Sequence, residues 1–135
     1  MIGKVAKRTN SKEFLSFLKL LDRRTHAERQ LHIILDNLSA HKTEAIREWV
    51  ASRPRIHLHF TPTSSSWLNA VEGWFAQLER RALYRGVFTS VPELKAELER
   101  FIKAHNAQSA KPFKWTKPAS HILASVGRAK EVLQN

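Results

Sequence analysis

The chain has 135 residues, which suggests one domain or part of one, and its 42% hydrophobic and 26% charged residues are an ordinary globular mix. It has no cysteine, no signal peptide and no apolar run near the ~20 residues that span a bilayer, so disulfides, thiolate metal sites and membrane insertion are excluded and an intracellular soluble protein is expected. The net charge of +11 favours a polyanionic partner, nucleic acid before an anionic membrane, the alternative being a basic protein without such a partner.

Three segments of the first half are candidate strands. Residues 2–8 alternate weakly, the apolar run 31–35 predicts a buried strand ending at Asp36, and 56–60 predicts a strand with one apolar face. Strands that alternate with helices predict an α/β domain with parallel pairing. In such sheets the functional crevice lies beyond the carboxyl ends of the strands, which is where Asp36 is expected.

Helical periodicity predicts helices over residues 11–27, 43–52, 67–84 and 91–105, and a last one after Pro118. The first opens on an Asn10–Glu13 cap, the third follows the polar turn 63–66 and ends near Gly86, and the fourth opens on a capping box at 90–93. The core stripe expected on the third helix comprises Leu68, Val71, Phe75, Leu78 and Ala82.

Asp36 and Glu72 are the pair with the most chemical meaning. If the helix that carries Glu72 packs back over the sheet, both carboxylates meet at one crevice and offer the oxygen ligands that Mg²⁺ prefers. The spacing alone also fits a turn aspartate and a solvated glutamate, which is the more common case.

The local sequence around this pair is more specific. The relevant segments are residues 35–37 (LDN), 41–43 (HKT), 59–75 (HFTPTSSSWLNAVEGWF), 111–116 (KPFKWT) and 121–123 (HIL). In this order and spacing they resemble the IS630-type transposases of the Tc1/mariner superfamily, and the resemblance covers Gly3 to about Ser125.

The resemblance implies an RNase H-like core (the DDE integrase/transposase fold) with a triad of acids that binds two divalent ions, Mg²⁺ or Mn²⁺. Asp36 matches the second acid and Glu72 the third. Asn37, His41 and Asn69 match residues that flank the site and hold the ligands or position DNA. The family reaction nicks transposon ends by hydrolysis, and the freed 3′ hydroxyl then attacks target DNA, typically at TA.

The chain departs from this pattern at the first acid, which the family carries on its first strand. Asp22 is the only other aspartate, and we do not assign it because it falls inside a predicted helix. We therefore expect a partial DDE transposase catalytic domain over residues 1–135, truncated N-terminally and lacking the first two strands, with its core at about 1–85 and C-terminal helices at about 86–135.

Two consequences follow from the missing acid and strands. Two carboxylates neutralise two cations poorly, so metal binding is expected to be weak or absent and the chain inactive in cleavage on its own. The strand 31–35 is expected to have an unpaired edge, which predicts self-association or pairing with a separately encoded N-terminal half.

Basic and aromatic residues outside the pair are candidate DNA contacts: Lys42, Arg80, Arg81, Arg85, Lys111, Lys114, Trp115 and Lys117. The three arginines also suit a helix C-terminus, and the segment 111–117 also suits a docked tail with solvated lysines. For Arg53 and Arg55 the sequence likewise leaves open whether they contact phosphates.

The remaining histidines and tryptophans have simpler interpretations. His57 and His59 lie on one face of a strand and could pair on a metal, but polar positions on a half-buried strand are more common, and His32 looks ordinary. We expect Trp49, Trp67 and Trp74, at helical positions, to pack in the core and not to stack on bases.

Three functions stay open. The first is an enzyme fragment for DNA transposition and recombination in a mobile element, acting on transposon ends and target DNA in the bacterial cytoplasm, associated with the nucleoid. The second is a non-catalytic DNA-binding module that regulates a full-length transposase, and the third is a translated remnant without a role.

Overall fold

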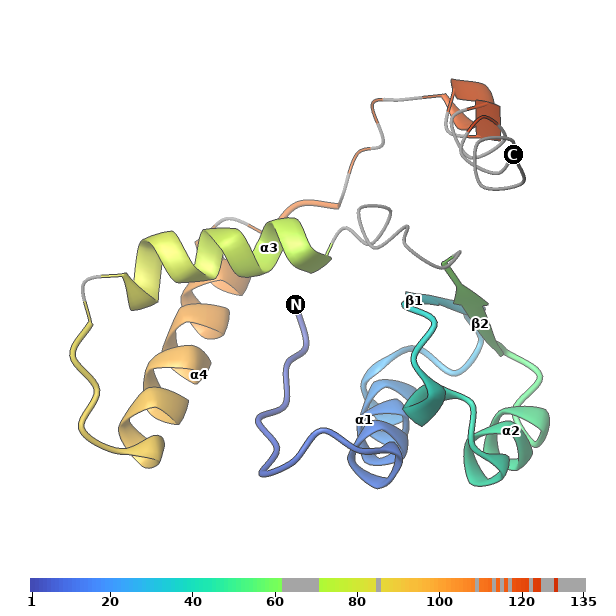
Figure 1. Cartoon of the computed structure of the whole chain (residues 1–135), viewed down its shortest axis with the longest axis horizontal. Helices are drawn as coiled ribbons and strands as arrows, with labels where there is room; N and C mark the ends of the chain where they lie inside the picture. The colour runs from blue at the N-terminus through green and yellow to red at the C-terminus, as the bar shows by residue number, and fades with distance from the viewer. Residues whose placement is uncertain are drawn as a thin grey trace.

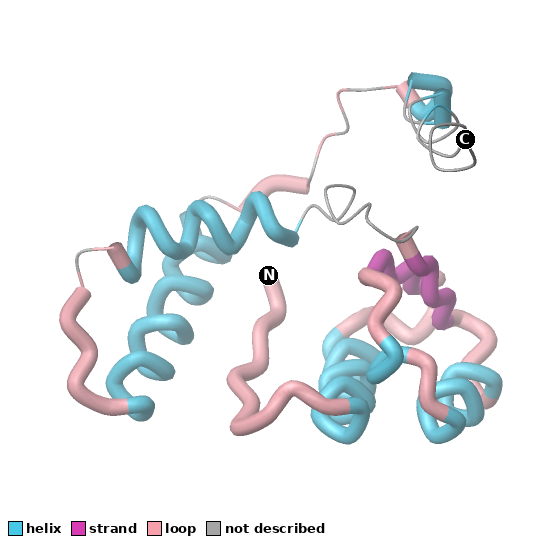
Figure 2. The backbone as a smooth tube through the Cα atoms, viewed as in Figure 1, coloured by secondary structure: helices cyan, strands magenta, loops and turns pink. Residues whose placement is uncertain are grey.

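A computed structural model of the chain describes residues 1–61, 71–84, 86–108, 110–112, 118–121 and 123–124, together with residues 114, 116 and 128. Its elements are α1 (Ser11–Arg24), β1 (Leu31–Leu35), the 3₁₀ turn η1 (Ser39–His41), α2 (Glu44–Ala51), β2 (Ile56–Phe60), α3 (Val71–Leu78), the π-helical turn η3 (Glu79–Leu83) and α4 (Val91–Gln108). The strands gather with α1 and α2 on one side of the molecule, and α3 and α4 lie on the other (Figures 1 and 2).

The strands β1 and β2 form a parallel pair, as expected for an α/β domain. Leu31 lies opposite Ile56 and Leu35 opposite Phe60, so the two carboxyl ends are level. In the described residues β1 has no second neighbour, so its other edge is unpaired there. Both strands have the predicted bounds.

The core lies between one face of this sheet and the helices α1 and α2. Leu18, Ile46, Trp49 and Ile56 form its buried cluster. Because side chains alternate along a strand, Leu31, Ile33 and Leu58 also turn toward the helices. The partly buried side chains that pack against the cluster are Phe14, Leu15, Leu31, Ile33, Val50 and Leu58. Burial of Trp49 agrees with its expected packing role.

The helix α1 begins as predicted and ends three residues early. The side chain of Asn10 accepts a hydrogen bond from the Glu13 backbone N–H at 2.9 Å, which satisfies one of the free donors of the first turn. At the other end Thr25 adopts an extended conformation, and its hydroxyl donates to the Leu21 carbonyl at 2.8 Å. The expected helix to residue 27 is therefore wrong in its last turn.

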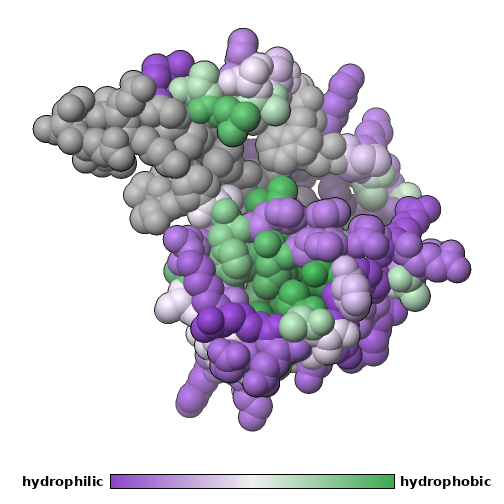
Figure 3. Space-filling model, turned by 90° about the vertical axis from the view of Figure 1, so that its right-hand side faces the viewer, coloured by the Kyte–Doolittle hydropathy of each residue, from purple (hydrophilic) through white to green (hydrophobic). Residues whose placement is uncertain are grey.

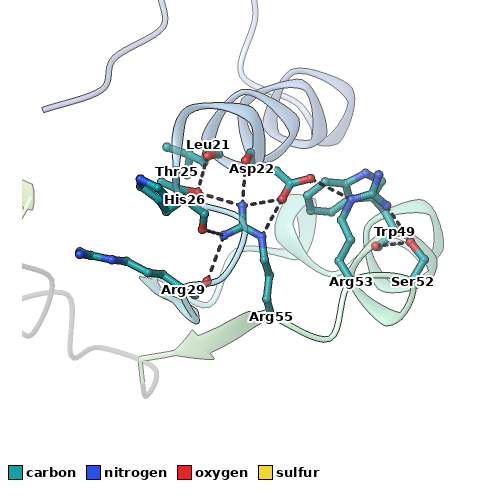
Figure 4. Close-up of polar contacts among 9 residues, drawn as sticks. All are labelled: Leu21, Asp22, Thr25, His26, Arg29, Trp49, Ser52, Arg53 and Arg55. Carbon is teal, nitrogen blue, oxygen red and sulfur yellow. Dashed lines mark hydrogen bonds and ion pairs between the residues drawn. The ribbon is translucent and has the colours of Figure 1, made fainter.

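An ionic cluster fastens the end of α1 to the start of β2 (Figure 4). Asp22 pairs with Arg55 at 2.7 Å and with Arg53 at 3.0 Å, and the Arg53 guanidinium also lies 4.4 Å above the Trp49 ring. These hydrogen bonds, that from Arg55 above all, hold the pKa of Asp22 below its ordinary value of 3.8. The structure thus gives Arg53 and Arg55 partners inside the chain and Asp22 a structural role.

The second half packs around Trp74 and Leu78 of α3. Leu78 is buried, and the Trp74 ring meets those of Phe101 and His105 of α4 edge to face at 6.0 and 6.4 Å. Trp74 therefore packs as expected. After Leu78 the chain widens into η3, where the Tyr84 N–H donates to the Glu79 carbonyl at 2.8 Å, so a π-helical turn replaces the regular helix expected there.

The opening segment is not a strand. Residues 2–8 have no strand partner, and the segment instead runs to α4, where the Met1 amino group donates to Asn106 Oδ1 at 2.6 Å and Asn106 Nδ2 donates to the Met1 carbonyl at 2.8 Å. A Cβ built on Gly3 would lie 2.6 Å from Ile102, which shows how closely this backbone approaches α4. Apolar and polar residues alternate only weakly in this segment, so its sequence does not strongly favour pairing with a strand.

The expected core stripe of α3 is only partly buried. Leu78 is buried, but Val71 is 42% and Phe75 55% exposed, because α3 packs on α4 and not on the sheet. Leu68 lies outside the described residues, as do Trp67 and the polar turn 63–66.

The fourth predicted helix is present and longer than expected, since α4 extends to Gln108. One half of its capping box is as predicted, because Ser90 Oγ accepts from the Glu93 N–H at 3.3 Å. In the other half the Glu93 carboxylate accepts from Thr89, one residue before Ser90, through the N–H and the hydroxyl, both at 2.9 Å. After Pro118 the described residues 119–121, 123–124 and 128 are helical, which agrees with the last predicted helix.

Candidate active site

Asp36 lies at the carboxyl end of the parallel pair. It follows Leu35, which is 5% exposed, and the Thr61 N–H donates to the Leu35 carbonyl at 2.8 Å just beyond the other strand. Thr61 is itself buried, so the strand end that directly precedes Asp36 is fixed in position. Its side chain is 42% exposed, which leaves the carboxylate open to a ligand.

His41 holds the Asp36 carboxylate. The turn η1 brings His41 Nδ1 to 3.0 Å from Asp36 Oδ1 and 3.3 Å from the Asp36 carbonyl, and the Phe14 ring of α1 lies 4.2 Å from the imidazole. The His41 side chain is only 15% exposed, so its position is fixed from both sides. An N–H that donates to one carboxylate oxygen orients the other oxygen, an arrangement typical of groups that hold a metal ligand.

Two further predicted residues lie on this end of the sheet. Lys42 is exposed, and its ammonium lies 5.0 Å from the centre of the Phe60 ring. Asn37 is exposed beside Asp36. Asn69 falls outside the described residues, so its expected place beside the acids stays a prediction.

Glu72 is the residue that the structure does not bring to Asp36. It lies in the first described turn of α3, it is exposed, and no hydrogen bond or ion pair within the described residues joins it to Asp36 or to another group. The reason is the packing of α3 on α4, which leaves this helix off the sheet. Convergence of the two carboxylates stays a prediction.

The fit to a divalent cation is therefore partial. Carboxylate oxygens that are accessible to solvent are the donors that Mg²⁺ prefers, and both acids supply them. Within the described residues, however, no three His, Asp or Glu side chains converge to hold a metal ion. We derive no catalytic step through the metal from this arrangement.

The candidate DNA contacts that the structure describes are all exposed: Lys42, Arg80, Arg81, Lys111 and Lys114. Arg80 and Arg81 lie in η3, far along the chain from the strand end that carries Lys42. Arg85, Trp115 and Lys117 lie outside the described residues. On the side that carries α2 and β2, polar side chains surround an apolar hollow (Figure 3).

That hollow is a groove of about 700 Å³ between α2 and β2. Its apolar floor includes Ile46, Val50 and Leu58, and Lys42 and Arg47 belong to its lining. The lining is mostly apolar and includes no Asp or Glu, and its two cations suit a phosphate-bearing partner better than a metal ion.

Sequence reasoning noted the pair His57 and His59 but missed that His32 joins them on the open face of the sheet. His32 of β1 lies against His57 and His59 of β2, with His32 Nδ1 2.9 Å from His59 Nε2. The two β2 histidines gave a signal through their alternation, but His32 joins them only through the register of the parallel pair.

The sequence profile described as "DDE superfamily endonuclease" matches residues 1–95. A protein described as "Insertion element IS630 uncharacterized 39 kDa protein", from Shigella sonnei, is 30% identical over 59 residues, which is 44% of this chain and 17% of that protein. The chain thus spans a small part of this relative. No solved structure matches the chain. No helix within the described residues is long and apolar enough to cross a membrane.

Proposed function

The chain belongs to the DDE superfamily endonucleases, of the IS630 type, and from this premise we propose that it carries part of the catalytic domain of a transposase, with Asp36 and Glu72 as two of its acids. The observation that carries the proposal is the Asp36–His41 pair at the carboxyl end of β1. Its 3.0 Å contact fixes an accessible carboxylate where an open parallel sheet places its functional groups.

In this proposal the acids hold divalent cations, Mg²⁺ or Mn²⁺. A bound ion would stabilise charge on the attacking and leaving oxygens when a phosphodiester is cleaved and then transferred. His41 keeps the Asp36 carboxylate in one orientation by donating to Oδ1, and the Phe14 ring keeps the imidazole in place. His41 is thus a positioning residue. We propose that Asn37 and Asn69 hold the ligands or position DNA at the same end of the sheet.

We further propose that the chain does not cleave DNA alone. Asp22, the only other aspartate, is held by Arg53 and Arg55 and is committed to the fold. Glu72 lies on a helix whose aromatic contacts are with α4, and in this sequence Asp22 is the one aspartate besides Asp36. An RNase H-like core would be completed by a second copy or by a separately encoded N-terminal half that pairs with the free edge of β1.

DNA is the proposed substrate and partner, both at transposon ends and at the target. The support is the net charge of +11 together with exposed cations on η3 and at the strand end. Each phosphate contact releases counterions, so binding should weaken steeply as salt rises. A regulatory DNA-binding module would share this property but would need no metal.

The test is nicking of a duplex that carries a terminal repeat, with Mg²⁺ or Mn²⁺. We expect no cleavage by the chain alone and cleavage when a fragment carrying the first strands and first acid is added. In that mixture Asp36→Asn and Glu72→Gln should abolish cleavage, and Glu79→Gln, an exposed acid farther along the same helical segment, should not.

Two outcomes would contradict the proposal. Cleavage by the chain alone that Glu72→Gln removes would refute its inactivity. Salt-sensitive DNA binding with no rescue of cleavage and no dependence on Asp36 would favour the regulatory module.

A further inference from the structure

A pair of histidine rings faces solvent on the side of the sheet away from α1 and α2. His32 lies on β1 and His59 on β2, and both are exposed. His32 Nδ1 and His59 Nε2 are 2.9 Å apart, whereas the ring centres are 5.2 Å apart. The rings therefore meet edge to edge, with two ring nitrogens turned toward one another.

Two facing ring nitrogens share a single hydrogen bond, which uses one proton. Between two neutral rings, one facing nitrogen carries the proton and the other accepts it. The outer nitrogens, His32 Nε2 and His59 Nδ1, have no hydrogen bond within the described residues. Either ring can thus move its proton to the outer nitrogen and present a lone pair inward, with no change in net charge.

The spacing is close to that of two imidazoles on one metal ion. Nitrogens bound tetrahedrally to Zn²⁺ at about 2.0–2.1 Å lie roughly 3.3–3.4 Å apart. The two nitrogens point at one another, so the 2.9 Å spacing would have to widen by a few tenths of an ångström and both rings would have to turn until their lone pairs converge on one ion. Exposed side chains have room for both changes.

A third histidine keeps the pair in place. The His57 ring stacks on His32 with centres 4.7 Å apart and planes 16° apart, and His57 Nε2 lies 2.7 Å from Gln30 Oε1. That contact makes Nε2 the protonated nitrogen of His57 and fixes its ring. His57 therefore supports the orientation of His32 without itself turning a nitrogen to the shared point.

We propose that His32 and His59 bind one borderline-soft divalent cation, such as Zn²⁺ or Ni²⁺, with water at its remaining positions. The site is independent of the proposed function: it uses imidazole nitrogens, which suit these ions, and not the carboxylates that suit Mg²⁺. His32 precedes Asp36 by four residues, about 13 Å along a strand. The ion would link β1 to β2 across their open face and stabilise the folded chain.

The test is titration of the tagless full chain with ZnCl₂ or NiCl₂ by calorimetry, with MgCl₂ in excess. We expect one ion per chain, no competition by Mg²⁺, and a higher Tm with the ion. His32→Gln and His59→Gln should each lower the affinity at least about tenfold, the size that even outer-shell changes produce at metal sites. His57→Gln should have a smaller effect.

The matched control is His26→Gln, the same change at an exposed histidine outside the cluster, which should leave the affinity unchanged. A measurement on the unaltered chain guards against variants that fail to fold: ring ¹⁵N resonances should shift at His32 Nδ1 and His59 Nε2 when Zn²⁺ is added. Equal affinity in the His32→Gln chain and the unaltered chain, or shifts confined to other histidines, would overturn the proposal.

Discussion

Replacing Arg55 by methionine tests whether the ionic cluster fastens the two parts of the sheet domain. The five N–H groups of Arg55 make six hydrogen-bond contacts: to Asp22 Oδ1 twice, to Thr25 Oγ1, and to the carbonyls of Asp22, His26 and Arg29. These acceptors lie on the end of α1 and on the loop before β1, as Figure 4 shows. Methionine keeps much of the side-chain length and removes every donor.

The expected cost follows from burial. The Arg55 side chain is 15% and that of Asp22 24% exposed, so the pair lies between exposed ion pairs, worth about 0–1 kcal/mol, and buried ones, whose loss costs about 3–5 kcal/mol. Arg53 still neutralises Asp22 at 3.0 Å. We therefore expect a loss of about 2–3 kcal/mol, which lowers Tm by roughly 10 °C in a chain of this size.

The assay is urea unfolding of the full chain followed by circular dichroism. Arg47→Met is the matched control, because Arg47 is 69% exposed and meets Glu44 only at 3.7 Å, so its loss should cost under about 0.5 kcal/mol. If Arg55→Met destabilises the chain no more than Arg47→Met does, the cluster does not hold α1 to β2 and the reasoning is refuted.

Three further predictions concern stability. Leu18→Ala should lower the free energy of unfolding by about 2–5 kcal/mol in the same urea assay, because Leu18 is 1% exposed in the core. The pKa of Asp22 is held below 3.8 by Arg55, so the stability it adds is present above that value and is lost as pH falls through the lower folded pKa; the urea midpoint of the unaltered chain should drop more steeply below about pH 5 than that of Asp22→Asn. Ser90→Ala removes an N-cap acceptor 3.3 Å from the Glu93 N–H and should cost about 1 kcal/mol, read from the helical signal on heating, and an unchanged Tm would argue against the cap.

The sequence predicted the sheet domain well because its local and tertiary signals agree. The runs 31–35 and 56–60 are apolar in the pattern of strands with a helix-covered face, and both strands have the predicted bounds. Residues 2–8 had only weak alternation, and contacts with α4 decide their path. Local patterns do not reveal such contacts with residues about a hundred positions away.

The site was predicted unevenly for the same reason. Asp36 and His41 are near in sequence, so the strand end and the short turn bring them together. His32 and His59 meet only through strand register, and a positive residue such as Arg53 gives no sign of whether it faces a phosphate or Asp22. Cross-strand contacts and internal ion pairs depend on the folded arrangement, which composition does not fix.

Exposed apolar side chains lie beside both proposed acids, and this bears on how the site is completed. Ile34 is 49% exposed on the face of β1 that α1 and α2 leave open, while Val71 and Phe75, at 42% and 55%, flank Glu72 on α3. Fully burying one such side chain is worth about 1.5–3 kcal/mol. A polypeptide that covered these residues together would gain that free energy by drawing α3 toward the sheet, and the same movement would carry Glu72 toward Asp36. On the proposed function, we therefore expect assembly of the acids to be coupled to burial of apolar surface, and we expect Phe75→Ser to weaken reconstituted cleavage without altering any metal ligand.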